Sequence, residues 1–143
     1  MDLPTLLKLC GFAHIALGLG SAAIPRLLDW RAALASVPVL IRQMFWTYAG
    51  YILFINLFFG VVSLVLTDEL LSGSGLAVAV AGLIAVYWLA RLVIQFTYFD
   101  KTGVPTGGIY AVGEYALVAL FVLFGAVYSY VTYVNLTLTG APL

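Results

Sequence analysis

The chain has 143 residues, of which 64% are hydrophobic and 8% charged, and its six basic and six acidic side chains leave no net charge. Soluble domains carry about 25% charged residues, so a chain this apolar would aggregate in water, and the composition predicts a membrane protein. The balanced charge excludes a nucleic-acid partner, which needs a basic surface. One cysteine excludes an intramolecular disulfide, and one histidine argues against a structural zinc site, which needs three or four ligands.

Four long apolar stretches follow one another along the chain, at residues 5–24, 42–66, 76–99 and 109–135. A hydrocarbon core about 30 Å thick needs about 20 helical residues, so each stretch is long enough to cross a bilayer. We therefore predict an all-α integral membrane protein, in which a four-transmembrane-helix bundle forms a single domain over residues 1–143. We expect the first stretch to be a retained helix rather than a signal peptide, because almost no basic region precedes it.

The segments between these helices are short. Residues 26–37 place Leu27, Trp30 and Leu34 at helical spacing, which predicts a short interfacial helix with Trp30 at the level of the lipid headgroups. The first helix is expected to end at Pro25. Residues 72–75, Ser-Gly-Ser-Gly, predict a short flexible hairpin between the second and third helices.

Lysine and arginine in short loops set the orientation of a membrane protein. Arginines lie in or beside the first loop and a lysine lies in the third, whereas the second loop has only two acidic residues. We therefore predict a multi-pass protein with loops 25–41 and 100–108 in the cytoplasm and both termini outside. Asn135-Leu136-Thr137 matches an N-glycosylation acceptor on the outer face, but it lies too close to the membrane to be given weight.

Each predicted helix carries small and polar side chains along one face, and such faces are expected to turn toward one another rather than toward lipid. Arg91 and Glu114 both lie about 10 Å from the cytoplasmic ends of their helices at 1.5 Å per residue. We predict an ion pair between them, with Gln95 donating to the same carboxylate and with Tyr110 and Arg42 beside it. The pair would serve either as a structural link between helices or as part of a functional site.

His14, Asn56 and Tyr87 come to similar depths farther inside, at about 16–21 Å on the same scale. A neutral histidine both donates and accepts hydrogen bonds, which suits a proton relay, an axial metal ligand or a bond to a ligand carbonyl such as a quinone oxygen. The alternative is a histidine satisfied by Tyr87 or Asn56. Tyr87, Trp88 and Phe121 would line a flat apolar pocket, although core packing explains these aromatic residues equally well.

These observations leave several functions open. The expected site residues lie on the polar and aromatic faces: His14, Arg42, Trp46, Asn56, Tyr87, Trp88, Arg91, Gln95, Glu114 and Phe121. The first hypothesis is a protein that binds a lipophilic ligand (a quinone, isoprenoid, pigment or lipid) or serves as an accessory subunit of a membrane complex.

The second hypothesis is a small membrane enzyme acting by proton transfer on a lipophilic substrate. His14 or Glu114 would then be the general acid or base, and Arg91 with Arg42 would bind an anionic headgroup. The third is a homo-oligomeric transporter or channel. The sequence identifies no cofactor and no metal, and the expected partners are the lipid bilayer, a lipophilic molecule, and further copies or a larger membrane complex.

Overall fold

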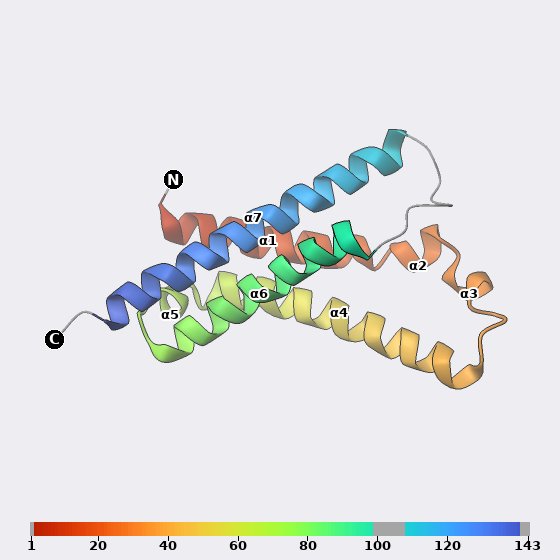
Figure 1. Cartoon of the computed structure of the whole chain (residues 1–143), viewed down its shortest axis with the longest axis horizontal. Helices are drawn as coiled ribbons and strands as arrows, with labels where there is room; N and C mark the ends of the chain where they lie inside the picture. Colours follow the sequence, from red (N-terminus) through yellow and green to blue (C-terminus); the bar gives the residue numbers. More distant parts are fainter. Residues whose placement is uncertain (1, 99–107, 141–143) are drawn as a thin grey trace. The chain divides into compact units, whose positions relative to one another are not determined.

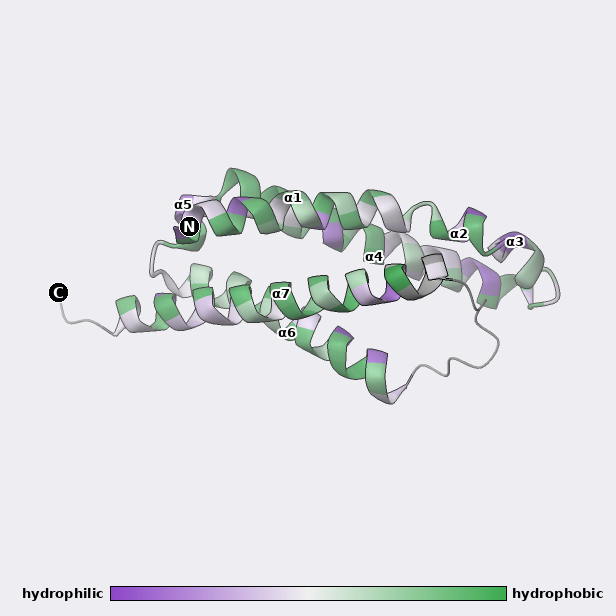
Figure 2. Ribbon diagram, turned by 90° about the horizontal axis from the view of Figure 1, so that it is seen from above, coloured by the Kyte–Doolittle hydropathy of each residue, from purple (hydrophilic) through white to green (hydrophobic). Residues whose placement is uncertain are grey.

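A computed structural model of the chain describes residues 2–98 and 108–140, with the backbone alone for residues 109–111. These residues form seven α-helices and no strand. The four long helices are α1 (Leu3–Ser21), α4 (Val39–Val65), α6 (Gly75–Thr97) and α7 (Gly108–Thr139) (Figure 1). Hydrophobic residues dominate all four (Figure 2), and each is long and apolar enough to cross a bilayer. The predicted all-helical fold with four span-length helices is confirmed.

The chain forms two compact units, Met1–Leu66 and Thr67–Leu143. In the first unit α1 packs against α4, and in the second α6 packs against α7. Figure 1 shows that the two helices of each pair run in opposite directions, as a short connection requires. The union of both pairs in a single four-helix domain stays a prediction.

Two glycines bring α1 and α4 into backbone contact. A Cβ added at Gly11 would lie 3.0 Å from the Gly60 carbonyl oxygen, and one added at Gly60 would lie 2.9 Å from the Gly11 carbonyl oxygen. Cys10 and Ser63, the neighbouring small residues on the same faces, are both buried. The small residues of the predicted polar faces therefore set the closest approach of this pair, as is common in membranes.

The connection from α1 to α4 differs from the expected continuous helix. α1 ends at Ser21, and two one-turn helices follow, α2 (Ile24–Leu27) and α3 (Trp30–Ala33). Pro25 lies at the start of α2, because its missing N–H cannot continue the hydrogen bonds of α1. Asp29 separates α2 from α3 in a left-handed conformation with φ 42°. Aspartate tolerates that conformation better than most residues, and it ends the helical run there.

The connection from α4 to α6 is attached to α7. It contains the one-turn helix α5 (Thr67–Leu70), then Gly73 with φ 69°, then Ser74, whose hydroxyl caps the first turn of α6. The side chain of Asn135 on α7 accepts from the Gly73 N–H at 2.8 Å and donates to the Leu70 carbonyl oxygen at 2.8 Å. A buried amide therefore holds this turn against the helix.

Candidate functional site

A chain of three polar side chains links α6 to α7 inside the predicted spans. Arg91 and Gln95 lie one helical turn apart, so their side chains leave the same face of α6. The Arg91 guanidinium donates to the Gln95 amide oxygen at 3.0 Å, and the Gln95 amide nitrogen donates to the Glu114 carboxylate at 3.5 Å. All three side chains are half-buried. The amide thus joins a cation on one helix to an anion on the other.

Aromatic rings form one side of this site. The Arg91 guanidinium carbon lies 5.0 Å from the centre of the Phe121 ring. Phe121 in turn stacks on Trp88 with ring centres 5.1 Å apart and 26° between the planes, and Tyr87 meets Trp88 edge-on at 5.2 Å. Trp88 and Phe121 are only 2% and 4% exposed. A guanidinium over a partly desolvated ring gains about 1–2 kcal/mol, so the rings help to fix the arginine.

We refer to Arg91, Gln95, Glu114, Trp88 and Phe121 as the Arg91 cluster. α6 and α7 separate toward the end of α6 and the start of α7 (Figures 1 and 2). The three polar residues of the cluster lie toward the separated ends, where their side chains are half-exposed, while the aromatic rings are buried. The Arg91 cluster therefore combines a partly accessible charge with buried aromatic rings that hold it.

His14 lies in the other helix pair. Its side chain is fully buried, its Nδ1 lies 2.7 Å from the Cys10 carbonyl oxygen, and its ring meets Phe59 edge-on at 6.0 Å. Because a carbonyl oxygen can only accept, Nδ1 carries the proton of a neutral ring. A carbonyl cannot pass a proton onward, so a relay through both ring nitrogens is disfavoured. The geometry favours a histidine that is held by its own helix.

Asn56 faces the same helix pair and is 5% exposed. Its amide nitrogen donates to the Ile52 carbonyl oxygen at 2.7 Å, which fixes the orientation of the amide. Its amide oxygen is buried and has no hydrogen-bond partner among residues 2–98 and 108–140. A buried acceptor without a donor costs about 1–3 kcal/mol, so Asn56 is a position where an added donor would be stabilising.

The structure distributes the predicted site residues over both units. His14 and Asn56 belong to the α1–α4 pair, and the Arg91 cluster belongs to the α6–α7 pair. Arg42 is half-buried in the first turn of α4, and Trp46 is exposed and packs against Trp30 with ring centres 5.9 Å apart. A direct Arg91–Glu114 ion pair and the approach of Arg42 to it stay predictions. The Tyr110 side chain and most of loop 100–108 lie outside the described residues.

Asn135 belongs to the glycosylation motif to which the sequence gave no weight. Its side chain is fully buried and its amide is held by Gly73, Leu70 and Val131. An acceptor site must be exposed, so the motif is incompatible with the fold. Asn135 is the last residue of the fourth apolar stretch, so the sequence alone gives no signal that it is buried.

No group of three histidine, cysteine, aspartate or glutamate side chains in the described part of the chain lies close enough to hold a metal ion. Comparison of the sequence with protein-family models and curated proteins, and of the structure with solved structures, finds no match.

Proposed function

We propose that the protein is a multi-pass membrane protein that binds a lipophilic molecule with a polar or anionic head at the Arg91 cluster. The observation that carries this proposal is the half-buried chain Arg91–Gln95–Glu114 next to the buried stack of Trp88 and Phe121. The guanidinium would hold the head of the ligand, the buried rings would fix the guanidinium, and the apolar body of the ligand would lie along the exposed apolar surface of α6 and α7. Ligand sites typically place a few polar groups beside apolar surface.

The energetics of the membrane support a functional role for these charges. An arginine at the centre of a transmembrane helix costs about 2.5–3.5 kcal/mol of insertion free energy, and arginines within a span are rare and usually face a site or partner. Arg91 lies between the centre and the end of α6, so its cost is a part of that value. A guanidinium presents several donors in one plane and suits carboxylates, phosphates and polarised carbonyls. Quinones, isoprenoid phosphates and lipids all carry such oxygens on an apolar body.

The test is identification of the small molecules that remain bound after purification in a mild detergent. The wild-type protein, Arg91→Ala and Glu114→Gln would be extracted with organic solvent and the extracts compared by mass spectrometry. Loss of one charge-assisted hydrogen bond weakens binding by about 1.5–3 kcal/mol, or roughly tenfold to a hundredfold. We expect a defined lipophilic compound with the wild type and a loss of about tenfold or more with Arg91→Ala.

The matched control is Val93→Ala, on the same helix but 59% exposed. It should keep the compound at the wild-type level, which separates a local effect from general damage to α6. Extracts that hold only bulk phospholipid in all samples would contradict the ligand proposal. Co-purification with other membrane proteins in that case would favour an accessory subunit.

An enzymatic role receives less support from the geometry. It would use Glu114 as acid or base, or His14, whose Nδ1 proton is engaged by the Cys10 carbonyl oxygen. Glu114 accepts from the Gln95 amide that also holds Arg91, so its carboxylate already takes part in a link between the two helices. Turnover of a lipophilic substrate that disappears in Glu114→Gln would revive this alternative.

The proposed orientation, with loops 25–41 and 100–108 in the cytoplasm, rests on the distribution of lysine and arginine between the loops. It places the polar end of the Arg91 cluster near the cytoplasmic side. A ligand head held there would lie closer to that leaflet than to the other.

A further inference from the structure

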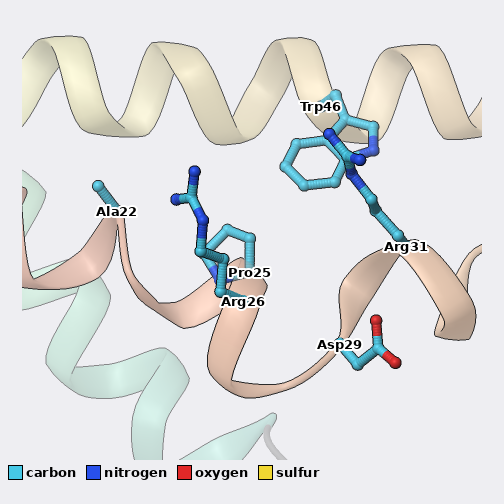
Figure 3. A pocket seen from close by; sticks show the side chains of 6 residues that line it. All are labelled: Ala22, Pro25, Arg26, Asp29, Arg31 and Trp46. Carbon is cyan, nitrogen blue, oxygen red and sulfur yellow. The ribbon is translucent and has the colours of Figure 1, made fainter.

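The segment that connects α1 to α4 borders a hollow of about 500 Å³. Its lining comes from the end of α1, from α2 and α3, and from the second turn of α4: Ala22, Pro25, Arg26, Asp29, Arg31 and Trp46. Figure 3 shows that Arg26 and Arg31 both extend their guanidinium groups from the α2–α3 segment toward α4. Asp29 points away from both, so the carboxylate does not occupy the space between them (Figure 3).

The break at Asp29 explains why two arginines share this hollow. In a straight helix, residues five positions apart leave the axis about 140° apart at 100° per residue, so Arg26 and Arg31 would point to different sides. The left-handed Asp29, with φ 42°, turns the chain between them. Its side chain accepts weakly from the Ala32 N–H at 3.5 Å, which helps to hold the turn.

Aromatic residues provide the wall opposite the arginines. Trp46 lines the hollow, and Trp30 packs against both Trp46, at 5.9 Å, and Phe45, at 4.9 Å between ring centres. Tryptophan is enriched where membrane-spanning helices reach the headgroup layer. The hollow therefore lies at the end of two predicted spans and combines two cations with aromatic surface.

We propose that this hollow binds a phosphate group, of the kind carried by the head of an anionic membrane lipid. Guanidinium groups bind phosphate oxygens in pairs, and two arginines converging on one space provide several donors for one anion. The proposed orientation places this loop at the cytoplasmic leaflet, where anionic lipids concentrate. The acyl chains would then lie beside the apolar start of α4, and the phosphate would lie between Arg26 and Arg31.

This site shares the proposed orientation but is independent of the ligand proposed for the Arg91 cluster. It is built from α2, α3 and α4 in the first compact unit, whereas the Arg91 cluster is built from α6 and α7 in the second. Either one can therefore fail in its own experiment without affecting the other.

The test measures lipid binding to the full chain in detergent by native mass spectrometry. Phosphatidylglycerol and phosphatidylcholine are offered in equal amounts to the wild-type protein, because they differ in net charge but share a phosphate and similar chains. We expect phosphatidylglycerol to bind at least about tenfold tighter, and Arg26→Gln with Arg31→Gln together to abolish the preference. Inorganic phosphate is added as a third arm. Competition by millimolar phosphate indicates a site for soluble phosphate, and its failure to compete indicates a lipid site.

The matched control is Lys8→Gln, which removes one exposed positive charge from α1 at the end opposite the hollow. It should keep the wild-type preference. A double variant that still prefers phosphatidylglycerol would overturn the proposal. The proposal would also fail if the wild-type protein shows no preference for phosphatidylglycerol over phosphatidylcholine and does not bind inorganic phosphate. The wild-type comparison does not depend on the folding of any variant.

Discussion

The contact between Gly11 and Gly60 gives the sharpest prediction about stability. In Gly60→Ala the new Cβ would lie 2.9 Å from the Gly11 carbonyl oxygen and 2.7 Å from Ile15 Cγ1. Both distances are below normal contact, and one partner is backbone, so α1 must move away from α4. Such overpacking typically costs about 1–3 kcal/mol of the free energy of unfolding. Alanine recovers up to about 1 kcal/mol through its higher helix propensity, so we expect a net loss of about 1–2 kcal/mol.

Gly50→Ala is the matched control, because nothing lies within 4 Å of a Cβ added at Gly50 on the same helix. It should unfold at or slightly above the wild-type temperature. Cys10, the single cysteine, is 1% exposed beside the contact, so its reaction with a thiol-reactive dye during heating reports the opening of this helix pair. At about 4 °C per kcal/mol, Gly60→Ala should lower the midpoint by about 4–8 °C. Equal midpoints for both variants would refute the close approach.

Three further predictions concern the polar side chains. Asn135→Ala leaves the Gly73 N–H and Leu70 carbonyl oxygen without their partner, so we expect a loss of about 1–3 kcal/mol in thermal unfolding; an unchanged midpoint would contradict the clamp. Gln95→Leu removes the amide between Arg91 and Glu114 and should lower stability by about 1–2 kcal/mol. The control Thr97→Ser, at an exposed position on the same helix, keeps the hydroxyl that bonds to Val93 and should leave stability unchanged; equal effects of the two variants would count against the link. Asn56→Leu removes the buried acceptor and should leave the midpoint unchanged or raise it, whereas a clear drop would show that a donor satisfies the amide oxygen.

The helices could be predicted from the sequence because span length and hydropathy dominate in an apolar chain. Their ends were harder to place, because they depend on single residues. α7 continues to Thr139 rather than ending near 135. The hydroxyl groups of Thr137 and Thr139 bond to carbonyl oxygens of their own helix, so these polar residues are accommodated within α7. The break at Asp29 depends on one backbone conformation that hydropathy does not encode.

The candidate site could be predicted only in part. The spacing of Arg91 and Gln95 predicts that they share a face of α6. The sequence does not tell whether Arg91 bonds to Glu114 directly or through the Gln95 amide. From the sequence, Arg26 and Arg31 indicate only which side of the membrane the first loop faces. They extend into one hollow because the chain turns at Asp29, and helical periodicity predicts a continuous helix there.

If each long helix crosses the bilayer, successive loops lie on alternate sides of the membrane. Single cysteines at Ser36, Ser72 and Thr106, in a Cys10→Ser background, would be labelled in intact cells with a maleimide that does not cross membranes. We expect Ser72→Cys to be labelled from outside, and Ser36→Cys and Thr106→Cys to be labelled only after the membrane is opened. Labelling of all three positions from one side would contradict four membrane-spanning helices.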